Sequence, residues 1–159
     1  MTDSTTHSQA REKADRPAGA LGVCSWSLQP TGTRDLDGLI AACGLKSVQL
    51  ALVPLVEQPR NWALAAESLR GSGVEVVSGM FQTAAEDYST LESIRRTGGL
   101  RPDEPWPATL ESALRVADLA QEIGIDLVSF HAGFIPPASE DPEGGALMER
   151  LRLRFELRR

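Results

Sequence analysis

The chain has 159 residues, enough for one domain with a hydrophobic core of its own. Hydrophobic residues make up 42% and charged residues 24%, as in ordinary globular proteins, and the net charge of −6 argues against nonspecific binding to nucleic acid or anionic membranes. No apolar run reaches the roughly 18 residues that a membrane-spanning helix needs. Neither nucleic acid nor a membrane is therefore an expected partner.

Residues 1–19 are predicted to form a disordered leader. They are polar, include His7, and lack the hydrophobic segment of a secretory signal, which favours a cytoplasmic protein. Cys24 and Cys43 are too few for a disulfide framework and do not form a CxxC metal motif. Because both lie in apolar surroundings without a charged neighbour, we expect buried free thiols in a reducing compartment rather than a catalytic cysteine.

From residue 20 onward, short apolar runs alternate with stretches in which apolar residues recur at helical spacing. Gly44, Gly73 and Gly124 each precede a predicted strand, as expected where a helix must end and turn back into a sheet. Alternating strands and helices imply a parallel sheet with helical crossovers. The predicted strands are 20–28, 46–52, 74–81 and 126–131, and the predicted helices are 35–43, 61–69, 107–123 and 147–155.

The connection between the third strand and the third helix, residues 82–106, is unusually long. It contains Tyr88, the Gly98-Gly99 pair and several prolines around Trp106. Connections of this length commonly carry function or are mobile, and on a barrel this one would lie at the C-terminal face, where active sites are built. The glycine pair alone does not make a phosphate-binding loop.

Four motifs carry a family resemblance. They are GVCSWSL, VQLAL, GMF and VSFHAGF, which occur in this order at residues 22–28, 48–52, 79–81 and 128–134. Together they resemble the xylose isomerase-like TIM-barrel superfamily, which includes sugar phosphate isomerases/epimerases and endonuclease-IV-type nucleases. The resemblance covers about residues 21–137. It implies an α/β fold of the (β/α)8 TIM-barrel type, in which residues 20–159 supply about four βα units, the N-terminal half of the barrel.

The resemblance also suggests substrate-binding residues, although it assigns no catalytic one. His131 ends the fourth strand, where relatives have a pocket-facing histidine, and histidine is the side chain that titrates near neutral pH. The alternative is a histidine that only caps backbone groups. Trp26 could line a sugar ring or pack in the core. Gln49 stands in the second strand, where many relatives carry an acidic residue, and Phe81 closes the third strand, where the nucleases have a histidine.

Complete relatives bind one divalent cation, Mg²⁺ or Mn²⁺, through carboxylates and a histidine on strands five to eight. After His131 the chain contains no further histidine, and its acidic residues fit a loop and the start of a helix. The resemblance therefore places no metal ligand and no cofactor in this chain, which we expect to be inactive alone. The acidic residues are Glu140, Asp141, Glu143, Glu149 and Glu156.

Residues 150–159, RLRLRFELRR, end where a fifth strand should follow, so we expect a truncated, frameshifted or fragmentary product rather than a basic RNA-binding tail. The first hypothesis is a sugar (phosphate) isomerase/epimerase family protein without its metal-binding half, with a small sugar or sugar phosphate as its partner. The second is a non-catalytic half-barrel that pairs with a second copy, forming a homo-oligomer, or with a separate C-terminal half, because open sheet edges invite partners. An endonuclease-IV-like nuclease ranks last, because such a nuclease needs several histidines and this chain has only His7 and His131.

Overall fold

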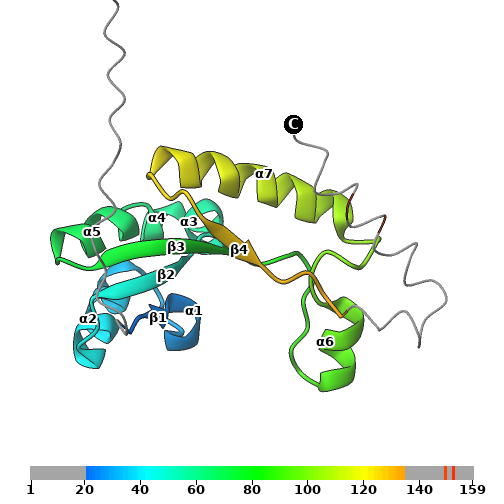
Figure 1. Cartoon of the computed structure of the whole chain (residues 1–159), viewed down its shortest axis with the longest axis horizontal. Coiled ribbons are helices and arrows are strands. Elements are labelled where there is room, and N and C mark those ends of the chain that lie inside the picture. The colour runs from blue at the N-terminus through cyan, green and yellow to red at the C-terminus, as the bar shows by residue number, and fades with distance from the viewer. Residues whose placement is uncertain (1–20, 135–148, 150–151, 153–159) are drawn as a thin grey trace, which may run out of the picture.

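The computed structural model describes residues 21–134, together with Glu149 and Arg152. Within this range four parallel strands form one sheet, in which each strand pairs with its neighbours in the sequence (Figure 1). The predicted alternation of parallel strands and crossover helices is confirmed. The strands are β1 (Val23–Cys24), β2 (Ser47–Ala51), β3 (Glu75–Phe81) and β4 (Val128–Phe130).

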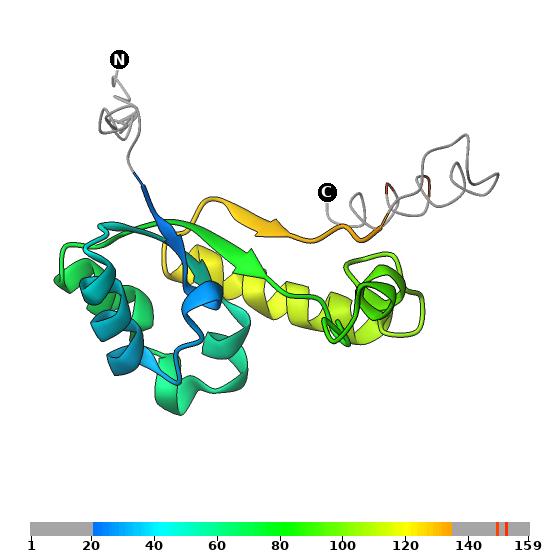
Figure 2. The same cartoon turned by 90° about the horizontal axis from the view of Figure 1, so that it is seen from below.

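Most helices cover one face of this sheet. Figure 2 shows α2, the α3–α5 segment and α7 beneath the strands, whereas α1 and α6 lie at the C-terminal ends of the strands. The opposite face of the sheet has no such layer among the described residues. The helices are α1 (Ser25–Leu28), α2 (Thr33–Cys43), α3 (Val53–Glu57), α4 (Pro59–Trp62), α5 (Ala65–Gly71), α6 (Leu91–Thr97) and α7 (Trp106–Glu122).

The hydrophobic core lies between the sheet and its helices. Val48, Leu50 and the following Leu52 are fully buried, so alternate positions of the β2 segment point toward the helix layer. Gly79 of β3 faces the same layer, and a β-carbon there would lie 2.4 Å from a methyl carbon of Leu52. The core is completed from α2, α5 and α7 by Leu36, Ile40, Ala65, Ala66, Leu69, Val116 and Ala120.

The longer helices and the central strands follow the predicted pattern. The helix expected over 35–43 is α2 and the one expected over 107–123 is α7, each with bounds within two residues of the prediction. Gly44 and Gly124 adopt the left-handed conformation, with φ of 66° and 69°, just after these helices. Both glycines therefore end helices ahead of a strand, as predicted.

Two predicted elements are wrong in extent. The strand expected over 20–28 contains only Val23–Cys24, because the chain leaves the sheet at Ser25, whose buried hydroxyl accepts a hydrogen bond from the Ala51 amide at 2.8 Å. The single helix expected over 61–69 is divided between the end of α4 and α5, and α3 precedes them as a helix that was not predicted. Pro54 and Pro59 stand in the first turns of α3 and α4, where the missing N–H is tolerated, so they begin helices.

Other predictions differ or fall outside the described residues. The 82–106 connection contains a helix, α6, that was not predicted. The expectation of two buried thiols is wrong for Cys43, which is exposed at the end of α2, while Cys24 is half-buried; both are free. The leader at 1–19, and the helix at 147–155 apart from helical Glu149 and Arg152, lie outside the described range. In that range no helix combines the length and apolar character needed to cross a membrane.

Candidate functional site

A row of polar side chains crosses the face of the sheet that the helices do not cover. Gln49 of β2 lies in register with Ser78 of β3, and its side-chain amide donates to the Ser78 hydroxyl at 3.3 Å and to the Ser129 hydroxyl of β4 at 3.0 Å. Ser129 is the residue of β4 that pairs with Met80 in the ladder between β3 and β4. The alternation that buries Val48 and Leu50 therefore turns Gln49 to the open face.

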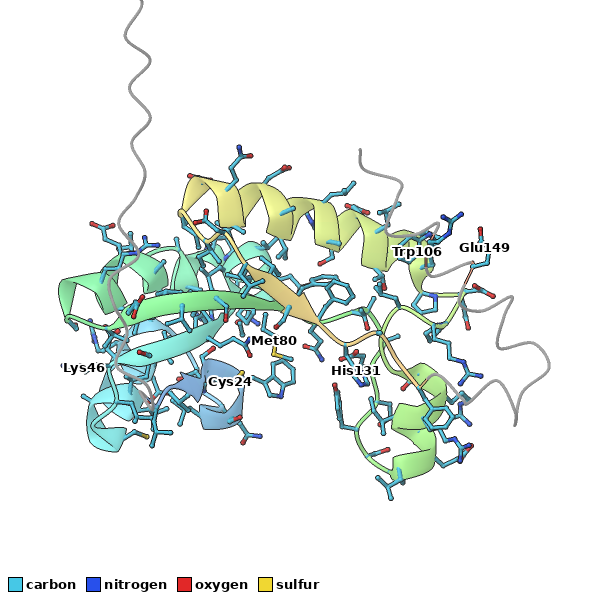
Figure 3. The ribbon with its side chains drawn as sticks, viewed as in Figure 1. Cys24, Lys46, Met80, Trp106, His131 and Glu149 are labelled. Atoms are coloured by element: carbon cyan, nitrogen blue, oxygen red, sulfur yellow. The ribbon has the colours of Figure 1, made fainter. Side chains whose placement is uncertain are left out.

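The same face continues to β1 through sulfur-containing side chains. Cys24 pairs in register with Gln49, and its thiol approaches the Met80 thioether at 3.7 Å. Figure 3 shows the Cys24 and Met80 side chains beside each other. Trp26 follows in α1 and is 42% exposed. An amide, three hydroxyl or thiol groups and an exposed indole near the strand ends offer both hydrogen bonds and an apolar surface, the combination found in small-molecule sites.

His131 lies just beyond β4, two residues after Ser129 and beside α6 (Figure 3). Half of its side chain, 51%, is exposed. Its Nδ1 atom lies 3.9 Å from Oε1 of Glu86, whose side chain is only 2% exposed. This distance exceeds a hydrogen bond, so the contact is electrostatic.

Glu86 is the hydrogen-bonding centre of the connection between β3 and α7. Its Oε1 accepts from the Thr83 hydroxyl at 2.8 Å and from the Gly99 amide at 2.9 Å, and its Oε2 accepts from the Tyr88 hydroxyl at 3.1 Å. Burial and then the negative charge of Glu86 raise the pKa of Tyr88 above its ordinary value. The carboxylate thus organises both ends of the segment around α6.

Asp87, the next residue, behaves differently. It is exposed and accepts a hydrogen bond from the Ser89 amide at 2.9 Å. Hydrogen bonds from Ser89 hold the pKa of this carboxyl below its ordinary value. Two adjacent carboxylates therefore have separate tasks: Asp87 closes a local turn in front of α6, and Glu86 points inward toward His131.

The connection is fastened to the segment that follows β4. The Leu100 amide donates to the Ala132 carbonyl at 3.1 Å, and the Arg95 guanidinium stacks over the Phe134 ring at 4.3 Å. A β-carbon on Gly99 would lie within 2.5 Å of three backbone atoms of residues 131–133, so the two backbones touch. The Gly98-Gly99 pair serves this close approach.

The structure distributes the four predicted sugar-binding residues over three environments. Gln49 lies on the open face of the sheet, and His131 lies just beyond the C-terminal end of β4. Trp26 is exposed in α1. Phe81 is 4% exposed and packs in the main hydrophobic core on the helix side. Sequence reasoning did not single out Ser78, Ser129 or Glu86, which provide the hydrogen bonds around the predicted residues.

A hollow lies away from this polar row, between α2 and the α4–α5 segment. It is lined by charged and polar residues such as Arg34, Asp35 and Glu67, and by none of the predicted sugar-binding residues. Ser68 donates a hydrogen bond to Asp37 there, joining α5 to α2. This groove therefore belongs to the helix layer rather than to the open face of the sheet.

Comparison with known proteins identifies the fold. The structure is similar to the crystal structure of a xylose isomerase domain protein from Planctomyces limnophilus, with a TM-score of 0.59 and 20% sequence identity over 85% of this chain. The fold is a partial TIM barrel of the xylose isomerase-like type. The chain spans about half, 48%, of that solved chain. No family model matches the sequence, and no curated protein sequence matches it either.

The divalent cation that the sequence resemblance implies for complete relatives finds no ligand group among the described residues. Between residues 21 and 134, and at Glu149 and Arg152, no three histidine, cysteine, aspartate or glutamate side chains gather as a metal-binding group. Glu86 and His131 form a pair, but the other neighbours of Glu86 are hydroxyl and amide donors rather than ligands.

Proposed function

We propose that this chain supplies the sugar-binding wall of a sugar (phosphate) isomerase/epimerase-type barrel, with a small sugar or sugar phosphate as its ligand. The polar row from Gln49 through Ser78 to Ser129, on the open face of a sheet with a xylose isomerase-like fold, is the observation that carries the proposal. Amide and hydroxyl groups in fixed positions suit the hydroxyl groups of a sugar, because the protein groups and the sugar hydroxyls can each both donate and accept hydrogen bonds.

The residues at the strand ends extend this wall. Trp26 offers an exposed indole on which the apolar side of a sugar ring could rest, and His131 offers a ring nitrogen at the mouth of the half-barrel. We assign these groups to binding and orientation. The proton transfers of isomerisation are assigned to groups beyond this wall, so the 159-residue chain is proposed to bind without turnover.

Ligand titration tests the proposal. The chain is titrated with aldoses, ketoses and their phosphate esters while the side-chain amide of Gln49 and the ring of His131 are followed by NMR. We expect both signals to shift, and Gln49→Leu to weaken binding about tenfold, because hydrogen bonds of roughly 1 kcal/mol each are lost.

Gln121→Leu is the matched control, since Gln121 is exposed on α7, in the helix layer. This variant should bind like the unmodified chain. Equal weakening by both substitutions, or no shift with any sugar, would contradict the binding proposal. Epimerisation or isomerisation by the purified chain would contradict the assignment of proton transfer to other groups.

A second candidate function is a non-catalytic half-barrel that assembles with a second copy or with a separate C-terminal half. It is favoured by the position of β1 and β4, each of which has one partner strand in the described sheet, and by the partly exposed Trp26 and Phe130. Light scattering tests self-assembly. A monodisperse dimer supports pairing between copies, whereas a stable monomer contradicts it.

A further inference from the structure

We propose that Glu86 is a positioning residue for His131: it holds the neutral imidazole in the tautomer with the proton on Nδ1 and leaves Nε2 as a hydrogen-bond acceptor for a ligand hydroxyl. The role of Nε2 toward a sugar rests on the proposed function. The Glu86–His131 relation itself does not, because it is defined by contacts within the chain.

Burial of Glu86 is the first observation behind the proposal. A carboxylate that is 2% exposed must be compensated by nearby donors or positive charge. Thr83, Tyr88 and the Gly99 amide provide three hydrogen bonds, and none of these donors carries a positive charge. The imidazole of His131 lies beside this carboxylate, with its Nδ1 atom 3.9 Å from Oε1 of Glu86.

The direction of approach fixes which nitrogen is involved. The nearest imidazole atom to the carboxylate is Nδ1, and Gly98 leaves room beside it, since a β-carbon at Gly98 would come within 3.4 Å of that nitrogen. An ionised carboxylate only accepts hydrogen bonds, so it favours a proton on the facing nitrogen. In a neutral imidazole the other nitrogen then carries a lone pair.

The backbone beside Glu86 has an uncommon conformation. Ala85 adopts a φ of 64°, in the left-handed region that residues other than glycine rarely occupy. Such a conformation persists where surrounding contacts support it, and Ala85 stands between the Ala84 amide, which donates to the Thr109 hydroxyl, and the hydrogen-bonded side chain of Glu86. The connection therefore holds the carboxylate in place before any ligand arrives.

Histidine NMR tests the tautomer directly. The chain has two histidines, so His7→Asn leaves His131 as the one imidazole. Nitrogen chemical shifts recorded at alkaline pH, where the ring is neutral, distinguish protonated from unprotonated Nδ1. We expect the Nδ1-protonated form to predominate, with Nε2 unprotonated. Predominance of the Nε2-protonated form in the otherwise unmodified chain would overturn the proposal, whatever any Glu86 variant does.

Substitution tests the assignment to Glu86. Glu86→Gln keeps an acceptor for the loop donors but lets an amide N–H face Nδ1, so the tautomer ratio should change at least severalfold toward the Nε2-protonated form. Asp87→Asn removes the same charge one residue away, from a side chain bonded to Ser89, and should leave the ratio unchanged. Equal ratios in the Glu86 variant and the parent would overturn the proposal. No sugar is added, so failure here is distinct from failure of sugar binding.

Discussion

Tyr88, the one tyrosine of the chain, reports on the charge of Glu86 at the scale of a single residue. Burial is the main cause that raises the pKa of Tyr88 above its ordinary value of 10.0, and the charge of Glu86 and its hydrogen bond add to it. Glu86→Gln should therefore lower the pKa of Tyr88 toward the ordinary value. Titration followed by near-ultraviolet absorbance measures this change without interference from another tyrosine.

The raised pKa of Tyr88 also links stability to pH. Because the folded-state pKa lies above the unfolded value, the contribution to stability is complete below about pH 10 and is lost as the pH rises through the folded-state pKa. Urea unfolding at increasing alkaline pH should show this loss, and Tyr88→Phe should remove the part due to this residue. A Tyr88 that titrates at or below its ordinary value would contradict the described contact with Glu86.

Single residues of the site could be predicted only where a strand pattern placed them. Strand alternation puts Gln49 opposite the buried Val48 and Leu50, and the strand-end position singled out His131. Phe81 shares the strand end but faces the helix layer, which one-strand reasoning did not distinguish. Glu86 had no periodic signal, because its partners come together only through the folded connection between β3 and α7.

At the scale of elements, the contact between the β3–α7 connection and the end of β4 depends on Gly99. Its φ of 72° disfavours other residues, and an added β-carbon would meet backbone atoms at 2.2–2.5 Å that cannot move independently. Gly99→Ala should destabilise the protein by roughly 1–3 kcal/mol beyond the backbone strain. It should also shift the amide signals of His131 and Ala132, as measured by urea unfolding and NMR.

Gly44→Ala is the matched control for this substitution. Gly44 has a similar φ of 66° but nothing within 4 Å of an added β-carbon. It should therefore show the strain of the left-handed conformation alone, about 1 kcal/mol, and leave the signals of His131 in place. Equal destabilisation by both substitutions would show that the close approach of the two segments contributes nothing.

The long helices could be predicted from the sequence, whereas several short ones were missed. α2 and α7 are long enough for a repeating apolar pattern, and both were predicted. α1, α3 and α6 contain four to seven residues, and helices this short are held mainly by tertiary contacts and caps. For α6 a signal exists: Thr90 accepts a hydrogen bond from the Ser93 amide, with Glu92 in the first turn and Arg95 and Arg96 in the last.

For the whole molecule, the order of strands followed from their alternation with helices, since parallel neighbours need crossovers. The layer that faces the polar row could not be derived in the same way, because nothing in the described residues covers that face. The similarity to a solved chain of about twice the matched length gives the fold. Experiment must identify what binds to the open face.

If two copies close the half-barrel through their sheet edges, amide exchange should locate the contact. β2 and β3 each have two partner strands and should exchange slowly at every protein concentration, whereas the amides of β4 have one described partner strand and should exchange faster in the monomer. Edge pairing predicts that protection of residues 128–130 increases with concentration while that of β2 stays constant. Concentration-independent exchange of β4, together with a dimer in light scattering, would place the contact between copies elsewhere and contradict closure through this edge.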